Sequence, residues 1–507
     1  GARGTARTGG ADRRMPPQLG TPGGTGDDDP LRFCGDALSC CLRDAARFEF
    51  TFTIQGGDDD EIPETVFGCG PAGTLSADGV QIAPFRTNEK VAFFGDSITH
   101  GGIYLYELQL FEALRHPYAP VRIINSGISG NTAAGGLARI GFDLLDRGPD
   151  RVFVMFGMND VGRGNYRPGT PDEKTLAARS RSLDSYRHNL AAVVDRLLRA
   201  GKQVVLITPS PYDQYGTFNS GSVTPCNEPG LFDCAKIVRG IAAEKKLPVV
   251  EFHPVMTELL KKYPEKQLCG RDRIHPGRAG HLVMTSLLLE ALRESPEVGS
   301  ILIDVRAKKA SGAKGENLSV GENGGSFCYF PSALPWPVDK DYLAVDKIRP
   351  LTSRLNLEML RVTGLAPGKY TLRAEGRMLG SFSEAELAKG INLALLDTPS
   401  VRRAKHAARI VGQYRTVDRK LRNIVYGNTI ILRERGRIDD PAAAMATLDK
   451  WLAKQKKSPA FQYYRNVVND YRKNRPKEAE LKAEAENLYR ELYQAVRPEP
   501  FIVEISR

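Results

Sequence analysis

Long hydrophobic runs are missing from this 507-residue sequence. No apolar run approaches the roughly 18 residues that cross a bilayer, so we expect no transmembrane segment. The N-terminus also lacks a basic stretch followed by an apolar core, which predicts that no signal peptide is present in the sequence as given. Hydrophobic residues at 41% and charged residues at 26% are typical of a soluble globular protein.

Several binding motifs are absent as well. The 8 cysteines show no C-x-x-C spacing, which argues against a structural zinc site, and no H-E-x-x-H is present. The Gly-rich loop at residues 95–102 matches neither G-x-G-x-x-G nor G-x-x-x-x-G-K-[ST], so it is not expected to bind phosphate. We therefore expect chemistry without a metal or cofactor. Cys226 and Cys234 flank a Pro- and Gly-containing loop and are either a disulfide or two free thiols. We favour the disulfide, which would indicate an oxidising compartment.

The net charge of +11 is confined to one region. Residues 399–507 contain 24 Lys and Arg against 13 Asp and Glu, whereas residues 1–398 contain 47 of each sign. An acidic polymer, an anionic membrane or simple solubility would each account for this excess. The basic residues are mixed with acids and carry no recognisable nucleic-acid-binding motif, so no nucleic-acid partner is expected.

The composition changes along the chain predict four parts, since a chain of this length exceeds a single core. Residues 1–85 form a leader, disordered over 1–32 because it is rich in Gly, Pro, Arg and Asp, with short strands at Phe48–Ile54 and Gly79–Phe85. Three further parts follow: an α/β domain at 86–297, a β-rich accessory unit at 298–398 and a basic helical region at 399–507.

Apolar strands alternate with amphipathic helices within residues 86–297, which predicts a parallel sheet with helices on both faces. The expected strands are Val91–Phe94, Val121–Asn125, Arg151–Phe156, Gln203–Thr208 and Leu247–Phe252. The expected helices are Tyr104–Leu114, Thr132–Leu145, Thr175–Ala200, Leu231–Lys246 and Arg278–Arg293. Accessory strands are expected at Ile301–Val305, Phe327–Phe330, Tyr370–Ala374 and Arg377–Phe382, and helices beginning near Pro441, Pro459 and Pro476.

Four polar stretches lie at or above the carboxyl ends of these strands, where α/β sheets bind ligands. They are Gly95-Asp-Ser97, Asn125-Ser-Gly-Ile-Ser-Gly-Asn-Thr132, Gly157-Met-Asn-Asp160 and Asp272-Arg-Ile-His-Pro276. Taken singly, each has an ordinary structural explanation, because a serine caps helices and an asparagine or an Asp-to-His pair sits in turns. Their occurrence together at one rim favours a catalytic site.

Acyl transfer requires this set of groups. A serine hydroxyl such as that of Ser97 needs a general base, which His275 can be, and Asp272 can hold the imidazole in the required tautomer. An oxyanion needs fixed donors, which the backbone N–H groups of Ser97 and Gly130 and the amide of Asn159 would supply.

The four stretches resemble, in order, the motif blocks of the SGNH hydrolase superfamily, also called GDSL-type esterases, over about residues 88–295. The resemblance implies a three-layer αβα, flavodoxin-like sandwich with a five-stranded parallel sheet. It implies a Ser97, Asp272 and His275 triad and an oxyanion hole of Ser97, Gly130 and Asn159. Ile98 replaces the Leu of the GDSL name, a near-isosteric change.

Other polar and aromatic residues near this rim have either a substrate-binding or a structural role. Asp96, His100, Tyr212 and Tyr215 are candidates for substrate contact, with loop packing as the alternative for the two tyrosines. We expect His253 and His281 to be structural, and Trp336 to pack between domains in preference to stacking on a ligand.

The wider sequence, including Pro211-Tyr-Asp-Gln-Tyr-Gly216, is similar to multi-domain bacterial members that degrade polysaccharides. This resemblance implies a secreted or periplasmic esterase that acts on short-chain esters, with O-acetylated carbohydrate or another small ester as substrate. A lipid-directed acylhydrolase and a non-catalytic glycan-binding scaffold are the alternatives. The complete set of five catalytic residues argues against the scaffold.

Overall fold

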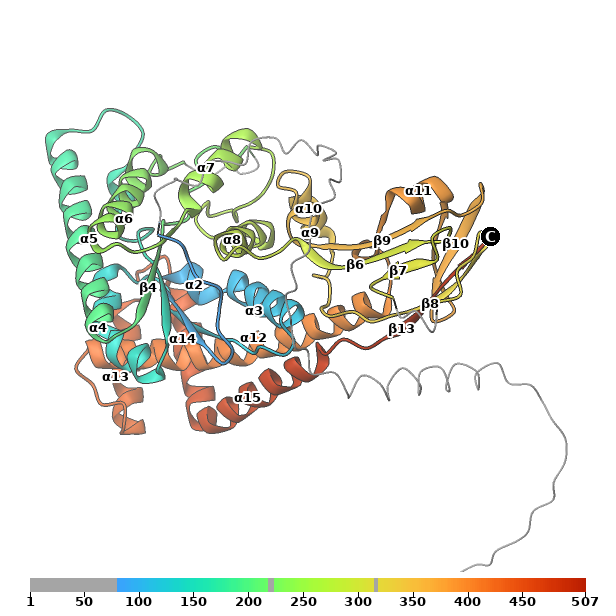
Figure 1. The fold of residues 1–507 in the computed structure, drawn as a ribbon. Coiled ribbons are helices and arrows are strands. Elements are labelled where there is room, and N and C mark those ends of the chain that lie inside the picture. The colour runs from blue at the N-terminus through green and yellow to red at the C-terminus, as the bar shows by residue number, and fades with distance from the viewer. Residues whose placement is uncertain (1–79, 218–222, 314–317) are drawn as a thin grey trace, which may run out of the picture. The chain divides into compact units, whose positions relative to one another are not determined.

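The computed structural model describes residues 80–217, 223–313 and 318–507 (Figure 1). The chain divides into residues 1–62 and 63–507, and all described residues belong to the second unit. The expected strand Phe48–Ile54 lies outside them. The expected strand at Gly79–Phe85 is wrong for residues 80–85, which form no regular element. Arg151 donates hydrogen bonds to the carbonyls of Ala83 and Pro84, so a side chain satisfies this backbone in place of a neighbouring strand.

A five-stranded parallel sheet forms the centre of residues 90–250, in the order β2-β1-β3-β4-β5. Its strands are β1 (Lys90–Gly95), β2 (Arg122–Gly127), β3 (Arg151–Met155), β4 (Gln203–Ile207) and β5 (Val249–Val250). Every strand that the sequence predicted within residues 86–297 is present, although β5 is much shorter than expected. The apolar run in β3 is fully buried, as expected for a strand covered on both faces.

Helices cover both faces of this sheet, which confirms the three-layer αβα fold (Figure 1). On one face α3 (Ile103–Arg115) packs against α8 (Arg278–Ala291). On the other face α5 (Glu173–Arg199) packs against α4 (Ala133–Asp143) and α6 (Phe232–Lys245). All five predicted helices are confirmed. Two further helices were not predicted, α2 (Ser97–Gly101) and α7 (Phe252–Lys262).

The β-rich accessory unit consists of two four-stranded sheets, ordered β11-β10-β13-β8 and β12-β9-β6-β7, that share one hydrophobic core. The strands are β6 (Glu297–Asp304), β7 (Lys309–Ser311), β8 (Gly324–Tyr329), β9 (Leu357–Thr363), β10 (Lys369–Ala374), β11 (Arg377–Ser383), β12 (Ile391–Asn392) and β13 (Phe501–Ser506). Short helices α9 (Lys340–Asp346), α10 (Leu351–Leu355) and α11 (Glu384–Lys389) connect some of them. Because β13 pairs with both β10 and β8, the expected helical region does not extend to the last residues.

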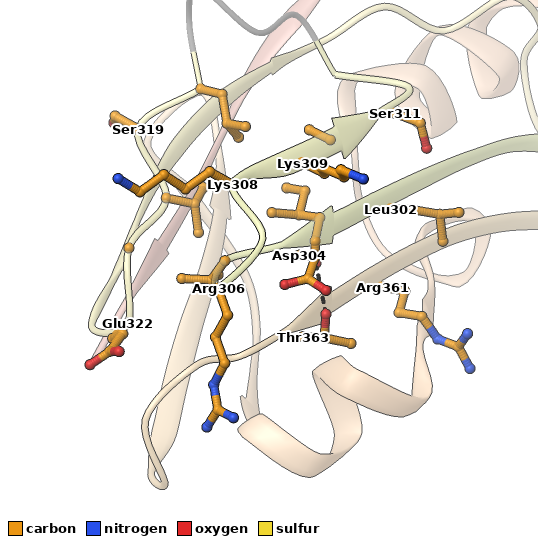
Figure 2. Close-up of a pocket in the computed structure, with 16 residues that line it drawn as sticks. Leu302, Asp304, Arg306, Lys308, Lys309, Ser311, Ser319, Glu322, Arg361 and Thr363 are labelled. Carbon is orange, nitrogen blue, oxygen red and sulfur yellow. Dashed lines mark hydrogen bonds between the residues drawn. The ribbon is translucent and has the colours of Figure 1, made fainter.

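A groove of about 1180 Å³ opens on this accessory unit (Figure 2). Basic side chains line it, namely Lys309 from β7, Arg361 from β9, and Arg306 and Lys308 from the turn between β6 and β7. None of the predicted catalytic residues contributes to the groove. Although it is large, the groove is therefore not the predicted active site.

Four long helices form the C-terminal region: α12 (Pro399–Arg433), α13 (Pro441–Lys454), α14 (Phe461–Asn474) and α15 (Glu478–Ala495). They are not a separate body, because Ala404, Ala407 and Ile410 of α12 belong to the same core as the parallel sheet. The hydroxyl of Tyr106 on α3 donates to Asp418 at 2.6 Å, which joins α3 to α12 through a buried bond. The backbone N–H of Val121, just before β2, donates to the hydroxyl of Tyr493 on α15.

The predicted disulfide between Cys226 and Cys234 is wrong, since both residues are buried free thiols. Both belong to the main hydrophobic core, where a thiol packs as a small apolar group. Burial raises the pKa of Cys226 to about 12, so its thiol stays protonated. The structural argument for an oxidising compartment is thereby lost. Among the described residues, no helix combines the length and the apolar character required to cross a membrane.

Candidate active site

Ser97 lies at the sharp turn between β1 and α2. The strand ends at Gly95, and the carboxylate of Asp96 accepts the N–H of Ile98 at 3.0 Å, which caps the helix. Glycine is required at position 95 because a Cβ there would lie 2.4 Å from Oγ1 of Thr99 and 2.7 Å from the carbonyl oxygen of Met155. This tight turn places the partly exposed Ser97 hydroxyl at the carboxyl end of the central strand.

His275 and Asp272 lie in the loop before α8 and reach Ser97. The Nε2 atom of His275 is 2.8 Å from Oγ of Ser97, and its Nδ1 atom is 2.5 Å from Oδ2 of Asp272. The other Asp272 oxygen accepts the backbone N–H groups of Ile274 at 3.0 Å and His275 at 3.1 Å. The structure thus brings the three predicted residues into one continuous hydrogen-bonded chain.

A buried arginine anchors this loop. Arg273 adopts a left-handed backbone conformation with φ +62°. Its guanidinium donates to the carbonyls of Asp213 at 2.9 Å and Gly216 at 3.0 Å. The N–H of Asp213 in turn donates to the carbonyl of Arg273. The loop is therefore fixed to the segment that follows β4, which restricts the position of the His275 ring.

The electrostatics of Asp272 suit a residue that orients a histidine. Partial burial alone would raise the pKa of its carboxyl, but the hydrogen bonds from His275 and Ile274 outweigh this and lower the pKa to about 2. An ionised carboxylate can only accept, so the imidazole carries its hydrogen on Nδ1 and leaves Nε2 free to take the proton of Ser97. Both side chains are nearly half exposed, so the site opens directly to solvent.

Two of the three predicted oxyanion residues, Gly130 and Asn159, lie on loops that are bonded to each other. Gly130 has φ +75°, a left-handed conformation that glycine adopts without strain, and a Cβ there would meet nothing within 4 Å. The amide of Asn159 donates to the carbonyl of Asn131 at 2.9 Å. Asp160 accepts the N–H groups of Gly157 at 3.1 Å and Ala133 at 2.8 Å, which ties the two loops together. Burial raises the pKa of Asp160 to about 7.

The Asn159 amide is held in one orientation. Its carbonyl oxygen accepts from Arg163 at 3.5 Å, and one of its amide hydrogens is used by Asn131. No described residue accepts the second hydrogen, so it is left for a ligand. Beside Asn159 lies a cavity of about 450 Å³. Polar side chains dominate its lining, among them Thr132, Asn165, Arg181, Ser182 and Ser185.

Three of the four candidates for substrate contact are buried instead. Asp96 serves as the cap of α2, and burial raises its pKa to about 6. His100 accepts the N–H of Ser129 on Nδ1, and burial together with the nearby Arg422 and Arg419 lowers its pKa to about 3. The hydroxyl of Tyr212 points inward and accepts the N–H of Thr224.

Tyr215 is the fourth candidate and is only partly exposed. Its hydroxyl donates to Glu228 at 2.7 Å, and the amino group of Lys261 lies 5.4 Å from its ring centroid. These contacts support loop packing for this side chain as well. His253, His281 and Trp336 are buried, as expected for structural residues.

The sequence analysis missed a buried ionic network behind the oxyanion loop. Arg139 on α4 donates to the carbonyls of Gly95 at 2.8 Å and Ser126 at 2.9 Å, and it also binds Asp143. Arg422 on α12 donates to Asp143 at 2.5 Å and to the carbonyl of Gly127 at 2.9 Å. The i,i+4 spacing of Arg139 and Asp143 on a predicted helix could have indicated their ion pair. Arg422 lies 279 residues beyond Asp143, and no local pattern connects them.

Several known proteins are similar to this chain in sequence or in fold. Residues 93–283 match the model of the GDSL-like lipase/acylhydrolase family. An acetylxylan esterase of Geobacillus stearothermophilus is 28% identical over 222 residues, which cover 41% of this chain and 94% of that protein. An uncharacterized lipoprotein of Bacillus subtilis is 29% identical over 132 residues, which cover 25% of this chain and 50% of that protein.

One solved structure is similar over most of the chain. A gut microbial diltiazem-metabolizing enzyme superposes with a TM-score of 0.76 at 25% sequence identity. The match covers 84% of this chain and 99% of that protein. It therefore extends well beyond residues 93–283 and includes a large share of the accessory unit and the C-terminal helices.

Proposed function

This chain carries a GDSL-like lipase/acylhydrolase domain, which makes it a carboxylic ester hydrolase. We propose that it is a serine esterase that removes acetyl groups from a carbohydrate or a comparable small ester. The continuous hydrogen-bonded chain from Ser97 through His275 to Asp272 is the observation that carries this proposal.

In the proposed mechanism His275 takes the proton of Ser97 while Oγ attacks the ester carbonyl. The backbone N–H groups of Ser97 and Gly130 and the amide of Asn159 hold the oxyanion of the tetrahedral intermediate. As the intermediate collapses, the alcohol leaves with the proton from His275 and an acetyl-enzyme remains. A water molecule, deprotonated by His275, then releases acetate and returns the proton to Ser97. Throughout, Asp272 stabilises the imidazolium.

Two observations support a polar substrate with a short acyl group. The cavity beside Asn159 is lined by hydroxyl, amide and guanidinium groups, which suit sugar hydroxyls better than an alkyl chain. The related acetylxylan esterase is matched over 94% of its length, so the likeness spans nearly all of that protein. The similar diltiazem-metabolizing enzyme supports a second candidate, a small ester that is not a sugar.

A site of action outside the cytoplasm remains part of the proposal. One relative is named a lipoprotein, which supports this location. The lipid-directed alternative is weaker, because residues of α12 and α15 belong to the core of the hydrolase domain and do not form a separate docking module.

Acetate release from acetylated xylooligosaccharides, diltiazem and p-nitrophenyl acetate tests the proposal, with p-nitrophenyl dodecanoate as the long-chain comparison. We expect Ser97→Ala to lower kcat at least roughly 1000-fold on every acetyl ester, because the nucleophile is lost. Ser300→Ala, at an exposed serine of β6, is the matched control and should leave the rate unchanged. Turnover that persists in Ser97→Ala would refute the catalytic assignment. Equal rates on acetyl and dodecanoyl esters would refute the preference for short acyl groups.

A further inference from the structure

Two glutamates and a histidine converge at the C-terminal end of α3. Glu112 and His116 are four residues apart and lie on one side of the last turn, and Glu294 follows α8. One ligand atom from each of the three residues lies within 4.8 Å of the others. Nε2 of His116 is 3.0 Å from Oε2 of Glu294. This group is separate from the triad, because α3 starts beside α2 and its C-terminal end lies away from Ser97.

Glu112 is an unusual member of this cluster because it is buried and has no partner. Only 2% of the residue is exposed, and its Oε1 atom is buried without a hydrogen bond from any described residue. Its burial and the neighbouring Glu294 carboxylate raise its pKa well above the usual range. A buried carboxylate without a donor is costly, so it requires a bound proton or a bound cation.

The terminal nitrogens of the nearby arginines are engaged elsewhere, whereas Nε of Arg115 is buried and has no hydrogen-bond acceptor among the described residues. The guanidinium of Arg115 donates to the carbonyls of Ser295 at 2.7 Å, Glu297 at 2.8 Å and Leu355 at 2.8 Å. Arg151 pairs with Glu89 at 2.9 Å. Both lower the pKa of Glu112 through their charge, but neither donates a hydrogen bond to it. The Glu112 carboxylate is therefore left facing His116 and Glu294.

We propose that Glu112, His116 and Glu294 bind a divalent transition-metal cation of the Zn²⁺ type. One imidazole nitrogen and two carboxylate oxygens form a ligand set that suits Zn²⁺, with water as a fourth ligand. Ca²⁺ and Mg²⁺ prefer six or more oxygen ligands and fit this set poorly. The cation would replace the bond between His116 and Glu294 and neutralise the two carboxylates. The exposed His116 ring is free to rotate toward it.

The position of the cluster indicates a structural role for the ion. Arg115 lies between Glu112 and His116 in the sequence. Its guanidinium donates to carbonyls in two connections, the one from α8 to β6 and the one from α10 to β9. A cation held by α3 and by Glu294 would fix the start of the accessory unit to the hydrolase domain. The inference does not depend on the proposed esterase function.

Zinc binding to the untagged full chain tests the proposal after removal of metals with EDTA. We expect titration calorimetry with ZnCl₂ to show one binding site. The midpoint temperature of thermal unfolding should rise by roughly 3 °C at saturation. His116→Ala, Glu294→Gln and Glu112→Gln should each weaken that binding roughly 10-fold or more. The matched control is His188→Ala, at an exposed histidine of α5, which should bind Zn²⁺ like the wild type.

Two outcomes would overturn the proposal. In one, the wild type binds no Zn²⁺ or binds Mg²⁺ equally well. In the other, Glu112→Gln retains the affinity of the wild type. That result would mean that Glu112 is a protonated acid and that Zn²⁺ binds elsewhere, for example at His275.

Discussion

At the scale of single residues, Asp272 has two separate tasks that its two oxygens divide. Oδ1 accepts two backbone N–H groups and shapes the loop, while Oδ2 accepts the imidazole of His275. The same bonds keep the carboxyl ionised. The shape of the loop and the orientation of the histidine therefore both depend on the Asp272 side chain. This explains how Asp272 can reach His275 only three positions further along the chain.

His281 shows how burial makes a residue sensitive to pH. It stacks on Tyr104 with ring centroids 5.8 Å apart, and burial lowers its pKa to about 3. In the unfolded chain its pKa is about 6.5. As the pH falls below about 6.5, His281 becomes protonated in the unfolded chain but stays neutral in the folded protein. The free energy of unfolding therefore decreases as the pH falls.

We expect His281→Gln to reduce this acid sensitivity. Between pH 7 and pH 5 the wild type should lose about 2 kcal/mol of unfolding free energy relative to the variant. Denaturant unfolding of both chains at the two pH values measures this difference. Asp96 and Asp160 have raised pKa values and act in the opposite direction, but they are common to both chains and cancel. His188→Gln, at an exposed histidine, is the control. An equal loss in wild type and His281→Gln would contradict the argument.

At the scale of elements, α12 supports the loop that carries Gly130. Arg422 reaches from α12 to Asp143 and to the carbonyl of Gly127, three residues before Gly130. Ile128 of this loop belongs to the hydrophobic core formed by the C-terminal helices. The ring of His100 lies 6.1 Å from that of Tyr426 on α12. The helical region thus supports one wall of the proposed active site.

Arg422→Met tests this support. The variant removes one of the two arginines bound to the buried Asp143, so we expect a loss of about 3 kcal/mol or more in unfolding free energy. Because the Gly127 carbonyl is released as well, kcat should fall roughly 10- to 100-fold. Denaturant unfolding and p-nitrophenyl acetate hydrolysis measure the two effects. Arg433→Met, at an exposed arginine of the same helix, should change neither. A stable and fully active Arg422→Met would show that α12 does not position the loop.

The elements of the hydrolase domain were predictable because their signals are local. Each strand is a short apolar run and each catalytic block follows one, so spacing and the topology of a parallel sheet place Ser97 and His275 together. The side-chain directions of His100 and Tyr212 were not predictable, because whether a loop residue faces solvent depends on distant elements. The prediction of a disulfide between Cys226 and Cys234 was wrong for the same reason. Their short spacing in the sequence did not indicate that both thiols are buried in the core.

At the scale of the whole molecule, the three parts of residues 80–507 are interleaved. The chain leaves the parallel sheet, builds most of the accessory unit, returns over the hydrolase domain as α12 to α15, and re-enters the accessory unit as β13. The strand β13 lies between β10 and β8, far from both in sequence. Such pairing has no local signature, which is why the predicted boundary at residue 399 did not anticipate it.

Deletion of residues 498–507 should therefore unfold the accessory unit and leave the hydrolase domain intact. It removes the buried Phe501, Val503 and Ile505 from the shared core, a loss of roughly 5–9 kcal/mol from burial alone. It also exposes the edges of β8 and β10. The core of the hydrolase domain keeps its C-terminal contacts, because Leu492, Tyr493 and Val496 remain.

Limited proteolysis with mass spectrometry measures this separation. We expect rapid cleavage of the deletion variant within residues 298–398 and little cleavage within 90–292. Hydrolysis of p-nitrophenyl acetate per folded molecule should persist, since neither the triad nor Arg422 contacts β13. A chain that lacks only the exposed Arg507 is the matched control, because it keeps every buried residue of the strand. Full-length resistance to protease in the deletion variant would mean that β8 and β10 hold the accessory unit without their central strand. Loss of activity together with cleavage would mean instead that the two units fold as one, joined by the contacts of Arg115 with both.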